Sequence, residues 1–180
     1  LKGHLRGSHA TLGKQVGRGF PKVFISANDH QIATKSSGRL ELAQWLTDPQ
    51  HPLTARVFVN RIWRWHFGHA LQPTTDNFGN LGEQPINQPL LDHLAKTFID
   101  NGWSIKHLHR TIMSSSTYRM SSTFNDAANK IDATNQYLWR FPVKRLEAEA
   151  IRDSILAVSG LLDRTMGGSM LPVKNHEFLF

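Results

Sequence analysis

The hydrophobic positions between residues 52 and 71 recur with the period of an α-helix. At about 100° per residue, one side of such a helix carries the apolar side chains Ala55, Phe58, Val59, Ile62 and Trp65. The opposite side carries the polar side chains Arg56, Asn60 and Arg64, with Arg61 close by. An apolar face opposite a charged face is typical of a helix that packs on a core. The pattern predicts a central amphipathic helix in this stretch.

The same periodicity predicts about four further helices, at residues 39–46, 89–99, 105–113 and 143–163. Residues 72–85, which follow the central helix, are rich in Gly, Pro, Asn and Asp. These residue types favour turns. The segment is long for a plain connection, and long ordered loops often carry function. We therefore expect an ordered loop here.

The first 35 residues are glycine-rich and contain few neighbouring apolar residues, which predicts an extended arm. The expected fold is mostly α, with about five helices around the central amphipathic helix. We expect two parts, an extended arm at residues 1–35 and a helical domain at residues 36–180. The sequence ends on Glu-Phe-Leu-Phe, and we expect the helical domain to be incomplete at its C-terminus.

The amino-acid composition limits the kinds of site and partner that this chain can have. The 180 residues include no cysteine, which excludes disulfides, thiolate metal sites and cysteine nucleophiles in this chain. The formal net charge of +7 favours acidic partners such as an anionic glycan or nucleic acid. The cations are spread along the chain, so nucleic-acid binding is a distant alternative. No window is long and apolar enough for a membrane span.

Two histidines at the end of the central helix have a spacing that can share a metal ion. His66 and His69 lie three residues apart, which brings side chains to the same side of a helix. Gly68 lies between them and indicates that the helix is already ending. No third ligand is close in sequence, so ordinary surface histidines are favoured and no metal site is predicted.

The polar face of the central helix has two interpretations. Arg56, Asn60, Arg61 and Arg64 could bind a carboxylate or phosphate, because the guanidinium group forms bidentate hydrogen bonds with both. Alternatively, they could form an ion-pair network with the last helix, whose polar face carries Arg145, Glu149, Arg152 and Asp153. Charges that are removed from water need such partners, and the network is favoured.

Acid–base catalysis needs carboxyl groups in a cleft. Asp76 and Glu83 lie in the predicted loop and are the candidate catalytic residues. Hydrolysis of a glycosidic bond uses two carboxyl groups about 5–10 Å apart, a separation that the sequence does not determine.

Seven motifs along the chain occur together in one known family. They are SGRLELAQWL at 37–46, HPLTARVFVNRIW at 51–63, HFG at 66–68, TDNFG at 75–79, LLD at 90–92, GWS at 102–104 and RLEAEAIRD at 145–153. In this order they resemble the planctomycete-specific domain of unknown function that lies near the C-terminus of large exported proteins. The resemblance covers nearly the whole chain.

The resemblance implies a cellular location and neighbouring domains, but it implies no particular reaction. Proteins of this kind are exported to the periplasm or cell envelope and often carry a cytochrome-c-like domain. The implied partners are other domains of the same protein, including a cytochrome-c-like domain. Haem c would lie in an adjoining domain, and no cofactor is expected in this piece. The family has no established catalytic residues to transfer.

Two kinds of function follow. The first is a structural and interaction module of an exported, cytochrome-c-associated protein, which docks through its basic and aromatic surface. The second is a hydrolase or lyase that acts on an anionic polysaccharide. In that case Arg56 or Arg64 would bind the anion, and Asp76 or Glu83 would act as acid or base. The sequence does not decide whether the protein is an enzyme.

Overall fold

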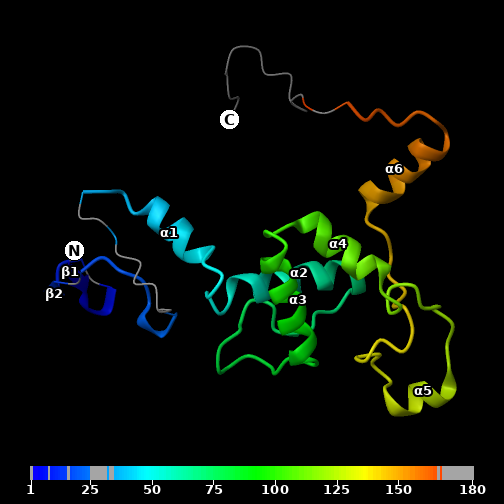
Figure 1. Ribbon diagram of the computed structural model, residues 1–180, viewed down its shortest axis with the longest axis horizontal. Coiled ribbons are helices and arrows are strands. Elements are labelled where there is room, and N and C mark those ends of the chain that lie inside the picture. Colours follow the sequence, from blue (N-terminus) through cyan, green and yellow to red (C-terminus); the bar gives the residue numbers. More distant parts are fainter. Residues whose placement is uncertain are drawn as a thin grey trace. The chain divides into compact units, whose positions relative to one another are not determined.

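The computed structural model describes residues 2–7, 9–15, 17–24, 32, 35–165 and 167. The chain divides into two compact units, Leu1–Pro142 and Val143–Phe180, and each is considered by itself. The described residues form six α-helices (Figure 1), which confirms the mostly helical prediction. No helix among these residues is long and apolar enough to cross a membrane.

The N-terminal arm forms a short hairpin and then contacts the first helix. Strands β1 (Lys2–His4) and β2 (Leu12–Gln15) pair antiparallel, and 3-10 helices occupy Leu5–Gly7 and Lys22–Phe24. The guanidinium group of Arg18 donates hydrogen bonds to the carbonyl oxygens of Ser36 (2.7 Å) and Ser37 (2.6 Å). The ring of Phe20 stacks on Trp45, with centroids 4.9 Å apart. These contacts hold the described part of the arm against the start of the helical region.

The first unit contains five of the described α-helices, and the first four lie between residues 39 and 114. These four are α1 (Arg39–Leu46), α2 (Thr54–Phe67), α3 (Gln88–Asp100) and α4 (Ile105–Ser114). Helix α1 begins after Gly38, which adopts the left-handed conformation at φ 83°. The helices α3 and α4 are capped by Asn87 and Ser104, whose side chains accept backbone N–H groups of the first turn.

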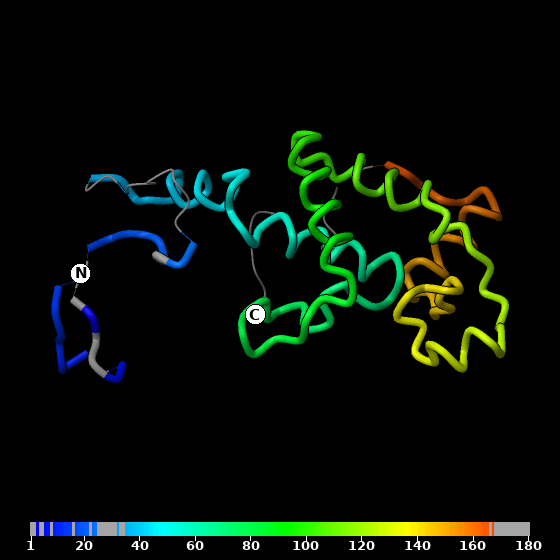
Figure 2. Tube along the Cα trace, turned by 60° about the horizontal axis from the view of Figure 1, so that its bottom comes forward, coloured from blue at the N-terminus to red at the C-terminus, as the bar shows by residue number. Residues whose placement is uncertain are grey.

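The core lies where α3 and α4 cross α2 (Figures 1 and 2). Its largest fully buried apolar side chains include Phe67 and Ile62 of α2, Leu91 of α3, and Leu108 and Ile112 of α4. Aromatic stacking joins α2 to α3, since the rings of Phe58 and Phe98 are nearly parallel with centroids 5.1 Å apart. The helix predicted to be central is therefore the one around which the core is built.

The buried face of α2 differs from the predicted one. Trp65 was expected to point inward, yet 61% of its surface is exposed. Asn60 was expected on the polar face, yet it is fully buried. Because α3 and α4 cover two adjacent sides of α2, the buried stripe also includes Trp63. The helix begins at Thr54, two residues after the start of the predicted stretch at residue 52.

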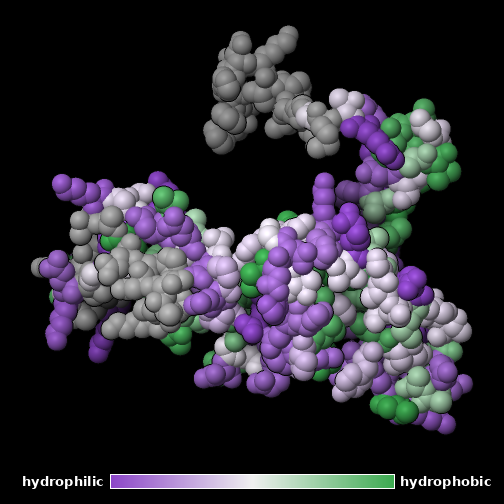
Figure 3. Space-filling view, in the orientation of Figure 1, coloured by the Kyte–Doolittle hydropathy of each residue, from purple (hydrophilic) through white to green (hydrophobic). Residues whose placement is uncertain are grey.

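Two later helices also differ from expectation. Helix α5 (Asp126–Ile131) forms in a segment without an apolar stripe, and the side chain of Asn125 caps it through the N–H of Ala128 at 3.0 Å. Helix α6 (Ala148–Val158) is shorter than the predicted 143–163. Periodic apolar positions predicted this helix, yet none of its residues is buried, and Figure 3 shows apolar side chains on its surface.

Candidate functional site

The loop after α2 is anchored by one buried amide. The Nδ2 group of Asn60 donates a hydrogen bond to the carbonyl oxygen of Gln72 at 3.0 Å. In return, the backbone N–H of Gln72 donates to Oδ1 of Asn60 at 2.8 Å. Both backbone groups of Gln72 are thereby satisfied away from water. This explains why a polar residue of α2 faces the interior.

Gln72 and Thr74 then close the loop on itself. The amide of Gln72 donates to Oγ1 of Thr74 at 3.2 Å and also to the carbonyl oxygen of Glu83. The hydroxyl of Thr74 accepts the N–H of Glu83 and donates to the carbonyl oxygen of Asn77, both at 3.0 Å. The two ends of the loop are thus tied together, which gives its side chains defined positions.

A groove of about 600 Å³ lies beside this loop and the end of α2. It brings together the predicted residues Arg64, His69, Asp76 and Glu83. The rest of the lining consists of Gly68, Ala70, Pro73, Thr75, Ile86, Thr134 and Gln136. The groove combines a cation, two carboxyl groups, an imidazole and several neutral hydrogen-bonding groups.

The charged groups of this groove keep free hydrogen-bonding capacity. One guanidinium nitrogen of Arg64 lies 3.4 Å from Oγ1 of Thr75. Within the part of the chain that the structure describes, the carboxylates of Asp76 and Glu83 form no hydrogen bond or ion pair. Burial lowers the pKa of His69 below its ordinary value of 6.5, and the charge of Asp132 partly opposes this. At neutral pH the groove therefore contains a neutral imidazole.

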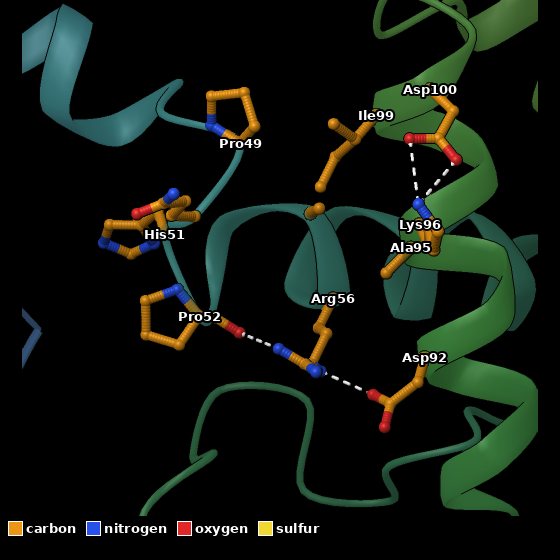
Figure 4. A pocket seen from close by; sticks show the side chains of 11 residues that line it. Pro49, His51, Pro52, Arg56, Asp92, Ala95, Lys96, Ile99 and Asp100 are labelled. Atoms are coloured by element: carbon orange, nitrogen blue, oxygen red, sulfur yellow. Dashed lines mark hydrogen bonds and ion pairs between the residues drawn. The ribbon is translucent and has the colours of Figure 1, made fainter. Parts of the chain in front are cut away.

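Arg56 lies in a different cavity from Arg64. This cavity, of about 340 Å³, lies between the turn at residues 49–52 and α3 (Figure 4). Nε of Arg56 donates to Oδ1 of Asp92 at 2.6 Å, and the guanidinium group also donates to the carbonyl oxygen of Pro52. Arg56 is therefore already neutralised by a partner on α3, and it does not join Arg64 in one anion site.

The residues of the last helix are exposed within their own unit. Arg152 forms an ion pair with the adjacent Asp153 at 3.0 Å. Arg145 and Glu149 are exposed. The expected network between this helix and the arginines of α2 would join the two units of the chain, and it stays a prediction.

The two histidines predicted as a pair have different neighbours. His69 lines the groove, whereas His66 contacts His109 of α4, with Nε2 of His66 2.8 Å from Nδ1 of His109. The sequence could not reveal the second contact, because His109 lies 43 residues further along the chain.

His51 is a structural residue that sequence reasoning missed. Its Nδ1 accepts the backbone N–H groups of Leu53 (3.3 Å) and Thr54 (3.2 Å), so it caps the start of α2. The Nδ1 atom is as many bonds from the backbone as the Oδ1 atom of Asn, a preferred capping residue. Burial lowers the pKa of His51, with partial opposition from the charge of Asp48. The signal in the sequence was a histidine three residues before the helix start.

The outer face of α2 carries a basic and aromatic patch. We define this patch as Arg61, Arg64 and Trp65, which are all exposed. Spacings of three and four residues bring them to one side of the helix. Opposite this patch, α2 is fixed by the core, so the patch is presented from a rigid element.

Comparison with known proteins places this arrangement in one family. Neither the curated proteins nor the solved structures include a significant match to the chain. The family model described as PSD1, protein of unknown function (DUF1553), matches residues 38–178. This range contains α1 to α6, the ordered loop, the groove and the patch. The chain therefore belongs to the PSD1 (DUF1553) family of proteins of unknown function.

Proposed function

We propose that this chain is a structural and interaction module of a longer, exported protein and that it docks on an acidic surface of another domain through the patch. The exported setting, in the periplasm or cell envelope, and a cytochrome-c-like partner domain are part of the proposal and rest on the family resemblance. The observation that carries it is the exposure of Trp65 on the same side of the central helix as two exposed arginines.

The chemistry of the patch supports docking. Tryptophan and arginine are the residues most enriched among those that dominate binding energy at protein interfaces. An indole that is 61% exposed on a core helix leaves a large apolar area in water. The adjacent guanidinium groups favour a partner surface with carboxylates and accelerate its approach at low salt. In the patch, the indole therefore supplies apolar contact area, and the guanidinium groups favour an acidic partner.

The proposal is tested by the dissociation constant between this chain and the remaining domains of the longer protein, measured by titration calorimetry at low salt. We expect Trp65→Ala to weaken binding by a factor of about 30, which corresponds to a hot-spot loss of about 2 kcal/mol. Leu81→Ala is the matched control, because Leu81 is 95% exposed but lies in the loop, outside the patch.

Two results would contradict docking through the patch. One is the absence of measurable binding by the unmodified chain at low salt. The other is an equal loss of affinity in Trp65→Ala and Leu81→Ala, which would show that the indole is not an anchor.

The groove supports a second candidate function, a hydrolase or lyase that acts on an anionic polysaccharide. Its specific support is that Arg64, Asp76 and Glu83 line one open groove, with the two carboxylates unpaired in the described part of the chain. In this function Arg64 would bind the anionic group, and a carboxyl group would act as acid or base. Arg56 has no part in it, since it pairs with Asp92.

This second candidate is tested by the release of reducing ends or unsaturated products from polyuronates and sulfated glycans. An enzyme of this kind would lose turnover in Asp76→Asn or Glu83→Gln and keep it in Arg61→Ala, because Arg61 does not line the groove. Turnover that survives both carboxylate substitutions would exclude the groove as its source.

A further inference from the structure

Two imidazole rings from different helices face each other at the side of the core. Nε2 of His66 on α2 lies 2.8 Å from Nδ1 of His109 on α4. The ring centroids are 5.0 Å apart, and the ring planes meet at 67°. A nitrogen–nitrogen contact of this length is a hydrogen bond, so one ring donates a proton and the other accepts it.

The surroundings hold both rings in place. His66 precedes the buried Phe67, and His109 follows the buried Leu108, so each backbone is fixed by a core residue. The ring of Tyr118 packs edge-on against His66, with centroids 5.3 Å apart, and it also contacts Phe67. Both histidines are half-buried. The pair is thus preorganised yet still within reach of solvent.

The converging nitrogens are close to the geometry of metal ligands. Zinc binds imidazole nitrogen at about 2.0–2.1 Å, so two tetrahedral ligands lie about 3.3 Å apart. The observed separation is shorter by about half an ångström. An ion would lie to one side of the line between the two nitrogens, so both rings would turn to direct their lone pairs at it, and the shared proton would be released.

We propose that His66 and His109 form a two-histidine site for a divalent transition-metal ion, with preference for Cu²⁺ over Ni²⁺ and Zn²⁺. Imidazole suits all three ions, and nitrogen sites bind Cu²⁺ most tightly among them. Among the described residues no group of three or more His, Asp or Glu side chains could hold a metal. Water or an external group therefore fills the remaining positions. This site is independent of the proposed docking function.

The test is a Cu²⁺ titration of the whole chain, followed by calorimetry and by electron paramagnetic resonance. One equivalent of Cu²⁺ is expected to show coupling to two imidazole nitrogens. His109→Ala is expected to weaken this binding by about tenfold or more. His107→Ala is the matched control, because it removes a half-buried histidine from the same helix that is not one of the two proposed ligands. We expect it to leave the binding unchanged.

Folding is controlled by a second variant and a second measurement. His109→Gln keeps a hydrogen-bonding side chain of similar length, and circular dichroism before titration verifies that each variant retains the helical fold. A folded His109→Gln or His109→Ala protein that binds Cu²⁺ as tightly as the unmodified chain would overturn the proposal. So would an equal loss in His107→Ala, since the ten histidines of the chain offer other weak sites.

Discussion

Asn60 links the central helix to the loop that shapes the groove. It is fully buried, and its amide satisfies both backbone groups of Gln72. An unpaired buried polar group costs about 1–3 kcal/mol, more than the hydrogen bond contributes on its own. A single side chain on α2 therefore determines whether the loop can leave the core in its observed direction.

Asn60→Leu is expected to lower the free energy of unfolding by about 2–3 kcal/mol, because it leaves the N–H and carbonyl groups of Gln72 buried without partners. Urea denaturation measures this loss. Asn80→Ala is the control, since Asn80 is exposed in the same loop, and we expect an effect of less than about 0.5 kcal/mol. A loss below 1 kcal/mol for Asn60→Leu would show that water or a rearranged loop replaces the lost bonds.

His51 and His69 make stability depend on pH. Burial lowers the pKa of both below the ordinary value of 6.5, so the unfolded chain binds protons more readily than the folded chain. The free energy of unfolding is therefore expected to be constant above about pH 7.5 and to fall as the pH drops below about 6.5. The urea midpoint at pH 7.5 and at pH 5.5 measures this difference.

His51→Asn separates the titration of His51 from its capping role. The asparagine keeps an acceptor for the N–H groups of Leu53 and Thr54 but cannot titrate. We expect a smaller loss of stability between pH 7.5 and pH 5.5 in this variant than in the unmodified chain. An unchanged loss would mean that His51 does not contribute.

At the scale of elements, the loop at residues 72–86 depends on one close backbone approach. A Cβ atom at Gly82 would overlap the carbonyl oxygen of Asn77 and would also crowd Oγ1 of Thr74 at 2.9 Å. The same atom at Gly79 would meet only Oδ1 of Asn77, at 3.3 Å. The two glycines therefore differ in what a side chain would displace, backbone in one case and a side-chain oxygen in the other.

Gly82→Ala is expected to lower the free energy of unfolding by about 1–3 kcal/mol, the usual cost of overpacking. Gly79→Ala is expected to cost less, because the side chain of Asn77 can move. Urea denaturation of both variants measures the difference. Equal effects would mean that the loop relaxes freely at Gly82.

Sequence periodicity identified most helices but not what they bury. The helices at residues 39–46, 89–99 and 105–113 were predicted to within about one residue, because each has an apolar stripe. Hydrophobicity alone placed Trp65 inside and Asn60 outside, since the partner of Asn60 is a backbone segment 12 residues away. Helix α5 was missed because its capping residue, and not an apolar stripe, marks it.

The sequence suggested which residues were candidates for the site, but it did not indicate which of them lie together. Arg64, Asp76 and Glu83 were candidates from their chemistry, and the path of the loop brings them to one groove. Arg56 was placed with Arg64 because both lie on the polar side of the helix, yet Asp92 of α3 pairs with it. Such pairings depend on which helices cross, and one sequence does not determine this.

For the whole molecule, docking through the patch requires that the patch be covered in the longer protein. The patch lies on α2, within the residues 38–178 that match the family. If docking is its function, Trp65 must be exposed in the isolated chain and protected when the other domains are present. Exposure of the indole can be read directly, without a binding constant.

The most direct measurement is hydroxyl-radical labelling of Trp65, detected by mass spectrometry, in the isolated chain and in the longer protein. Labelling of Leu81 in the same samples is the internal control, because Leu81 is highly exposed and lies outside the patch. We predict that Trp65 is labelled in the isolated chain and protected in the longer protein, while Leu81 is labelled equally in both. Equal labelling of Trp65 in both samples would contradict docking through the patch.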